Sequence, residues 1–199
     1  MDKIKASHDI IQAAIPLVPF DGWAQATLNA AALAAGYKKT DAIRVFPGGA
    51  VDAAEQFLRS YDAAMLDTLT GYHLPTMKIR QRIATAVRLR LEAMEPAREA
   101  VRKAVALLAQ PFHVHRALKG LYATTDAIWH ATGDTSTDFN FYTKRLLLAG
   151  VYSTTFIYWL DDKNPGHEDT WAFLDRRIED VMKIEGVKRW LFNPAARVA

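Results

Sequence analysis

Residues 137–161 form the segment that most limits how this chain can fold. The stretch from Leu146 to Leu160 is 15 residues long and contains no charged side chain. This length falls short of the roughly 20 residues that a membrane-spanning helix needs, so the stretch predicts a buried helix. A helix that is apolar on nearly all sides is surrounded by other helices. The sequence therefore predicts a helical bundle with 137–161 as its central helix.

Proline and glycine divide the rest of the chain into helical segments. Asn-Gly and Asp-Gly turns between alternating apolar strands, which would signal β-hairpins, are absent. The segments between the Pro and Gly positions have helical spacing of apolar residues. We therefore expect an all-α protein. Its roughly nine helices are predicted at 3–15, 22–35, 39–46, 49–69, 75–94, 96–110, 112–131, 137–161 and 167–190.

The composition is that of a folded globular protein. Half of the 199 residues are apolar, 24% are charged and the net charge is +3. The chain has no cysteine, which excludes disulfides, thiolate metal sites and thiol nucleophiles. Charges at Asp2, Lys3, Lys5 and Asp9 leave no room for the apolar core of a signal peptide. A cytoplasmic location is the corresponding expectation, with peripheral contact to the inner membrane left open.

Residues 22–49 have the proportions of a helix-turn-helix. An Ala-rich helix is followed by a turn at Gly36 and by a short helix that ends at Phe46-Pro47. With the neighbouring helices this resembles the DNA-binding half of TetR-type regulators. The resemblance implies a TetR-like fold, with a vestigial helix-turn-helix subdomain at 1–48 and a helical bundle at 49–199.

The same segment lacks the charges that DNA binding requires. Glycine stands after Phe46 where TetR-type regulators carry a lysine that contacts phosphate. Residues 1–70 contain 6 basic and 8 acidic side chains, whereas duplex binding depends on neutralising phosphates. We therefore expect no nucleic-acid partner. A TetR-type transcription regulator with an apolar effector remains the alternative.

The segment from Asp126 to Arg145 contains an unusual pattern, Trp-His-x-x-Gly-Asp-x-Ser-Thr-Asp-Phe-Asn at 129–140. Gly133 ends one predicted helix, and Ser136 and Thr137 can cap the next. The rings of 129–130 and 141–142 then gather at one corner of the molecule. A buried aromatic corner is one reading; an exposed contact surface, where Trp and Tyr are enriched, is the other.

This segment resembles the accessory lipid-binding proteins of ubiquinone biosynthesis in the Coq series, which have a TetR-like fold. The resemblance implies a non-catalytic, typically dimeric protein that presents a prenylated quinone intermediate to the demethoxyubiquinone hydroxylase. It also implies a bound lipid or isoprenoid quinone and no other cofactor. The partner-binding positions that it implies are Trp129, His130, Asp138, Phe141, Tyr142 and Arg145. Phe141 stands where relatives often have Trp.

An apolar cavity between the larger helices would suit such a lipid. Candidate wall residues are the apolar side chains that face inward on the predicted helices. They are Leu89, Leu108, Leu121, Leu147, Val151, Phe156, Trp171 and Leu174. Ordinary core packing is the alternative for each, and we expect it to hold for about half of them.

Signals for catalysis are weak. No Glu is followed by His three residues later, as a di-iron bundle would require, and Asp126 with His130 makes only one ligand pair. Residues 71–110 carry 8 basic and 3 acidic side chains, which predicts a solvated surface or attraction to anionic headgroups. At 187–191, Val-Lys-Arg-Trp-Leu is compatible with a short interfacial turn or with a fraying helix end.

Overall fold

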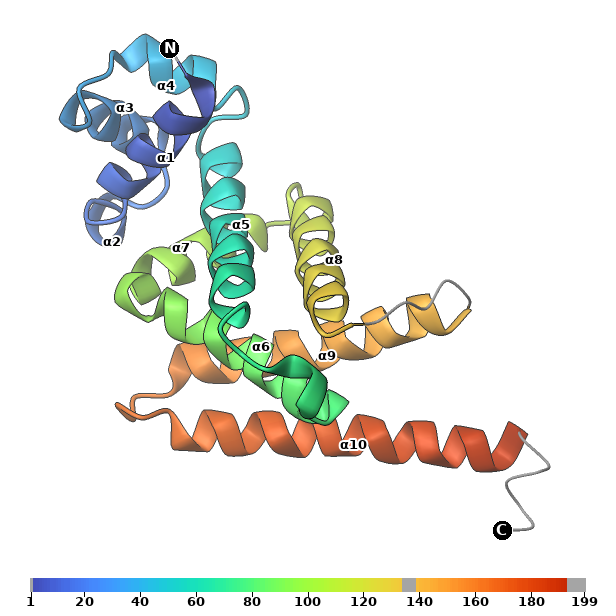
Figure 1. Ribbon diagram of the computed structural model, residues 1–199. Helices are drawn as coiled ribbons and strands as arrows, with labels where there is room; N and C mark the ends of the chain where they lie inside the picture. Colours follow the sequence, from blue (N-terminus) through green and yellow to red (C-terminus); the bar gives the residue numbers. More distant parts are fainter. Residues whose placement is uncertain (1, 134–138, 193–199) are drawn as a thin grey trace.

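A computed structural model describes residues 2–133 and 139–192, and the side chains at 139–141 and 184–192 lie outside that description. The described chain consists of helices joined by turns and short loops (Figure 1). Its α-helices are α1 (Lys3–Ala14), α2 (Val18–Asp21), α3 (Gln25–Ala34), α4 (Lys39–Val45), α5 (Ala50–Leu69), α6 (Ile79–Met94), α7 (Arg98–Leu108), α8 (Val114–Ala131), α9 (Phe139–Asp161) and α10 (Glu168–Phe192). Short 3-10 turns at Leu74–Thr76 and Glu95–Ala97 precede α6 and α7. The predicted all-α fold is confirmed, and each of the nine predicted helices has a counterpart. The one-turn helix α2 is additional.

Helices α1, α3 and α4 pack on one another at one end of the molecule, and the short α2 packs on α7 (Figure 1). Their shared core combines alanines without exposed surface, such as Ala31 and Ala42, with larger buried side chains such as Ile10 and Leu28. Trp23 joins this module to the larger bundle: its Nε1 donates to the carbonyl oxygen of Ala100, at 3.0 Å, and its ring lies 5.1 Å from that of Phe57. The division of the chain near residue 48 remains a prediction.

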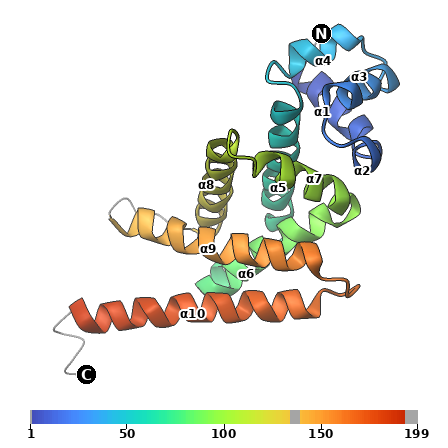
Figure 2. The same ribbon diagram turned by 180° about the vertical axis from the view of Figure 1, so that it is seen from behind.

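Helix α5 runs from the N-terminal module into the larger bundle (Figure 1). It packs against α6, α7 and α8, and Figure 2 shows α7 on the rear side of this arrangement. Helices α9 and α10 lie side by side at the far end and pack on α6 and, for α9, on α8.

The prediction that 137–161 is enclosed on all sides is wrong. Trp159 of α9 is fully buried, but Leu146 is 75% exposed and Ile157 is 66% exposed on the opposite face. The helix is apolar all round, yet only one side of it meets α6, α8 and α10. Apolar periodicity cannot distinguish a surrounded helix from one whose outer face is apolar and exposed. In the described part of the chain, no helix is both long and apolar enough to cross a membrane.

Candidate functional site

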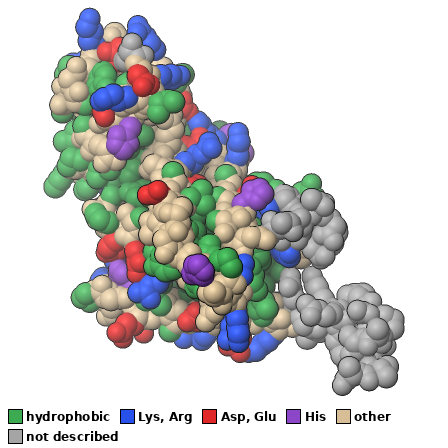
Figure 3. Space-filling view, viewed as in Figure 1, with side chains coloured by type: hydrophobic (Ala, Val, Ile, Leu, Met, Phe, Trp, Pro, Cys, Tyr) green, Lys and Arg blue, Asp and Glu red, His purple; other side chains and the backbone are tan. Residues whose placement is uncertain are grey.

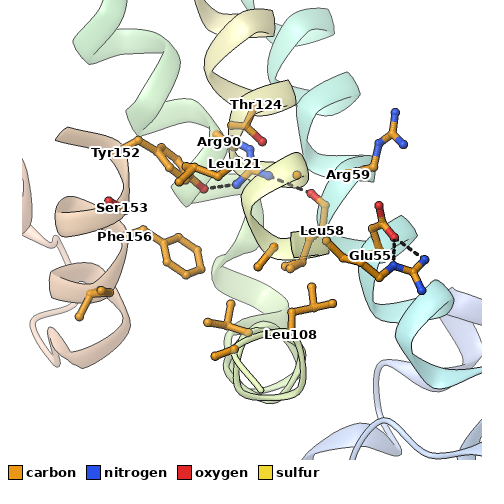
Figure 4. A pocket seen from close by; sticks show the side chains of 16 residues that line it. Glu55, Leu58, Arg59, Arg90, Leu108, Leu121, Thr124, Tyr152, Ser153 and Phe156 are labelled. Atoms are coloured by element: carbon orange, nitrogen blue, oxygen red, sulfur yellow. Dashed lines mark hydrogen bonds and ion pairs between the residues drawn. The ribbon is translucent and has the colours of Figure 1, made fainter. Parts of the chain in front are cut away.

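An apolar cavity of about 240 Å³ lies between α5, α6, α7, α8 and α9 (Figure 4). Its volume is close to the ~300 Å³ at the lower end of small-molecule sites. In the space-filling view, apolar side chains gather between α5 and α8, with Lys and Arg side chains toward the N-terminal module (Figure 3). The apolar lining residues are Leu58, Val105, Leu108, Ala109, Ala117, Leu121, Phe156 and Ile157.

One wall of the cavity is closed by a buried polar cluster around Arg90 (Figure 4). Arg90 is 4% exposed, and its Nε donates to Oδ1 of Asp62 at 2.7 Å. Its two terminal nitrogens donate to the hydroxyl of Tyr152 and to the carbonyl of Leu58. Thr124 donates from its hydroxyl to the same Asp62 oxygen, at 3.0 Å. The guanidinium thereby joins α5, α6 and α9, and Asp62 adds α8 through Thr124, which fixes this wall.

The opposite side of the cavity leads to a polar groove beside α1. Glu55, Arg59 and Arg116 line both the cavity and this groove. Arg116 of α8 forms ion pairs with Asp52 and Glu55 of α5. Burial raises the pKa of Asp52, but hydrogen bonds from Arg116 and from the backbone of Gly48 lower it more, so that this pKa lies below its usual value. The carboxylate is thus held in its charged form at neutral pH.

Three of the eight predicted lipid-binding residues line this cavity: Leu108, Leu121 and Phe156. Leu147 and Val151 instead line a smaller pocket of about 40 Å³ between α6, α8, α9 and α10.

The other three predicted residues lie outside both pockets. Leu174 is a core residue, and Leu89 packs against the core. Trp171 lies beneath Arg88, at 4.9 Å from the guanidinium carbon to the ring centre, and donates from Nε1 to the Gly166 carbonyl. Core packing therefore accounts for these three, in line with the alternative that the sequence left open.

Sequence reasoning missed the polar wall and most of the α8 lining. The α8 residues at 117, 120, 121 and 124 follow the 3–4 residue spacing of one helix face, and this periodicity would have found them. Arg90 was expected among the solvated basic residues of 71–110, and its burial corrects that expectation. No local signal marks it, because Asp62 and Tyr152, its partners, are 28 and 62 residues away.

The predicted partner-binding residues lie where α8 ends and α9 begins. His130 is exposed, and Tyr142 is 66% exposed. Trp129 is partly buried against the core, with the Lys144 ammonium 5.5 Å from its ring centre. The corner is therefore partly buried and partly exposed: Trp129 packs against the core, whereas His130 and Tyr142 are accessible to solvent.

Arg145 does not lie on this surface. It is 2% exposed, and its Nε donates to Oδ1 of Asp126 at 2.6 Å, which ties α9 to α8. Its position supports the corner from within. Asp138 and the side chain of Phe141 lie outside the described residues.

The pairing of Asp126 with Arg145 also bears on the candidate metal ligands. Asp126 and His130 lie one helical turn apart and were considered as a pair of metal ligands. The Asp126 carboxylate instead accepts a hydrogen bond from the Arg145 guanidinium. Within 2–133 and 139–192, no cluster of three or more His, Asp or Glu side chains has a geometry that could hold a metal ion.

The fold has a solved counterpart. The crystal structure of the TetR transcriptional regulator from Nitrosomonas europaea superposes with a TM-score of 0.70 and 18% sequence identity, over 87% of this chain and 95% of that one. Fold and site together define a TetR-like helical protein with an apolar cavity in its larger bundle.

The sequence comparisons are more specific. Residues 114–185 match the COQ9 family model. The chain is 33% identical to the mitochondrial ubiquinone biosynthesis protein COQ9 of Rattus norvegicus, over 89% of this chain, and 33% identical to that of Drosophila melanogaster, over 93%. It spans 59% and 57% of the lengths of these two proteins. The chain is thus similar in sequence to the COQ9 proteins, and the match to the family model lies at residues 114–185.

Proposed function

We propose that this protein acts in ubiquinone biosynthesis as a non-catalytic lipid-binding accessory protein. It binds an isoprenoid lipid in the cavity of the larger bundle and presents a prenylated quinone intermediate to the demethoxyubiquinone hydroxylase. The observation that carries this proposal is an apolar cavity in a chain whose relatives are named ubiquinone biosynthesis proteins.

The energetics favour a lipid as the occupant. Burying an apolar carbon contributes ~0.8 kcal/mol, so one five-carbon isoprene unit contributes about 4 kcal/mol. A cavity of about 240 Å³ encloses a short apolar portion of such a chain. Ile157 lines the cavity and is also 66% exposed, so it marks a place where a longer chain can leave.

The hydroxylase would dock on the corner formed by Trp129, His130 and Tyr142. Tyrosine and tryptophan carry much of the binding energy at protein interfaces. Tyr142 is largely exposed, so Tyr142→Ala should weaken hydroxylase binding about tenfold or more while leaving the thermal unfolding temperature unchanged. An unchanged affinity in a pull-down titration would remove this surface from the proposal.

A homodimer and a peripheral membrane contact belong to the same proposal. The exposed face of α9 carries Leu146 and Ile157 and extends to Tyr142, which is as exposed as Ile157. An exposed apolar face of this kind is typical of protein or membrane contact. Light scattering of the purified chain, with Leu146→Asp as the comparison, tests whether this face pairs two copies.

The main experiment is solvent extraction and mass spectrometry of lipid that co-purifies with the bacterially expressed protein. A stoichiometric isoprenoid quinone or other long-chain lipid is the expected result. Delipidated protein that binds no prenylated quinone would contradict the carrier role and leave a scaffold that acts on the hydroxylase by contact.

The rival function, a TetR-type transcription regulator, has the fold of the Nitrosomonas europaea protein in its favour. The short helix α4 exposes Ile43 beside Arg44, and Arg44 lies 3.7 Å from Asp41. We therefore expect no salt-dependent affinity for duplex DNA in a fluorescence-anisotropy titration.

A further inference from the structure

Tyr152 has an unused hydrogen-bond donor at the wall of the apolar cavity. The side chain is 6% exposed and lines the cavity (Figure 4). Its oxygen accepts a hydrogen bond from Nη1 of Arg90. Within the described part of the chain, the hydroxyl proton has no acceptor. A buried donor without a partner is costly, so its presence at a cavity wall points to an acceptor supplied by a ligand.

The surroundings of Tyr152 fix both the position and the state of this donor. Arg90 is held by Asp62 and by the Leu58 carbonyl, and its charge lies 5.2 Å from the centre of the tyrosine ring. Burial raises the pKa of Tyr152 to about 12, so the hydroxyl keeps its proton at neutral pH. A hydroxyl that accepts from a guanidinium is polarised and becomes a stronger donor.

The other polar groups of this wall have partners already. Thr124 donates its hydroxyl proton to Asp62, and Ser153 lies 3.4 Å from the Gly150 carbonyl oxygen. Most of the remaining lining is aliphatic or aromatic. Binding sites of this design use one or two fixed polar groups to orient a largely apolar ligand. Tyr152 is the group that fits this role.

We propose that the Tyr152 hydroxyl donates a hydrogen bond to an oxygen atom of the bound lipid, so that the cavity selects a lipid with a ring or chain oxygen over a hydrocarbon of the same shape. The inference rests on the proposed lipid-binding function and names the chemical class of its ligand. Tyr152 is then a specificity-determining residue, held in place by Arg90.

The test compares two ligands and two variants of the full chain after delipidation. The probes are geranylbenzoquinone and geranylbenzene, which share a tail and differ in the ring oxygens. Tyr152→Phe should weaken binding of geranylbenzoquinone roughly tenfold and change that of geranylbenzene less than twofold, since it removes one hydrogen bond. The matched control is Tyr158→Phe on the same helix, whose ring stacks on Phe173 outside the cavity. It should change neither affinity.

A second measurement keeps the inference testable if Tyr152→Phe unfolds. The infrared carbonyl stretch of geranylbenzoquinone bound to the unmodified protein should shift to lower wavenumber than in hexane. A carbonyl stretch at the same wavenumber as in hexane overturns the inference. An equal loss of affinity for both ligands in Tyr152→Phe overturns it as well. Failure of the unmodified protein to bind either ligand would instead contradict the proposed function itself.

Discussion

The two halves of the molecule use similar apolar residues in different ways. In the N-terminal module, Ala6, Ala31 and Ala42 are fully buried and bring α1, α3 and α4 into close contact. In the larger bundle, α5, α8 and α9 meet around larger side chains such as Leu121 and Phe156, which leave a cavity between them. In the N-terminal module these alanines pack closely with larger buried side chains such as Leu28, whereas the side chains of the larger bundle leave a hollow beside the buried Arg90 cluster.

The comparison has a functional side. The N-terminal module keeps the helical arrangement of a TetR-like fold but has an acidic charge balance. The larger bundle holds residues 114–185, which match the COQ9 family model, and lines the cavity. Under the proposed function, the first region would mainly support the bundle, through contacts such as that of Trp23 with Ala100, and the ligand would bind in the second.

The largest expected effect is at the polar wall of the cavity. Arg90→Leu leaves the Asp62 carboxylate without its ion-pair partner and should destabilise the fold by about 3–5 kcal/mol. Urea unfolding at pH 7 measures this loss. The control is Lys103→Ala on the exposed side of α7, which should change stability by ~0.5 kcal/mol or less. Similar values for both variants would mean that the buried cluster does not hold the wall.

A pair of leucine truncations compares a filled core with a cavity wall. Leu28 in α3 has no exposed surface, and Leu28→Ala should cost about 2–5 kcal/mol. Leu121 is partly buried and already borders empty space, so Leu121→Ala should cost less, below about 2 kcal/mol. Thermal unfolding measures the loss of stability in each variant. In a lipid titration, only Leu121→Ala should change the affinity. Equal destabilisation by both would remove the distinction between the two regions.

Restoring a lysine in the N-terminal module tests whether that region can regain the DNA contact of TetR-type proteins. Gly49, three residues after Phe46, has φ +64°, which favours glycine. Gly49→Lys should therefore destabilise the module by roughly 1–2 kcal/mol. Because 1–70 carries a net negative charge, the variant should still show no affinity for duplex DNA in anisotropy titrations. Clear, salt-dependent binding would contradict this view.

The smallest expected effect is the pH dependence of the pair between Asp52 and Arg116. The pKa of Asp52 is lowered from 3.8 in the folded state, so the pair stabilises the fold above that value and the stabilisation is lost as pH falls through the folded pKa. The unfolding free energy of the unmodified protein should exceed that of Arg116→Gln by about 1 kcal/mol or less at pH 6. This gap should close toward pH 3, and a gap that widens on acidification would be inconsistent with the pair.

Much of the fold and part of the site could be predicted from the sequence. Helical spacing and Pro or Gly punctuation predicted nine of the helices, because both are local signals. Leu108, Leu121 and Phe156 were predicted to line a lipid site and do line the cavity. Leu174 gives the same apolar signal and is a filled core position. Periodicity reports that a side chain faces inward, but it cannot report what lies opposite.

By itself, the sequence determined the all-helical class, the pattern at 129–140 that resembles the COQ9 proteins and the acidic balance of residues 1–70, since each depends on residues close together or on simple charge. The tertiary structure alone decided that Arg90 is buried and that one face of α9 is exposed at Leu146. It also decided that Tyr152 borders a cavity. These features depend on contacts between residues dozens of positions apart, whose geometry is set by how whole helices pack.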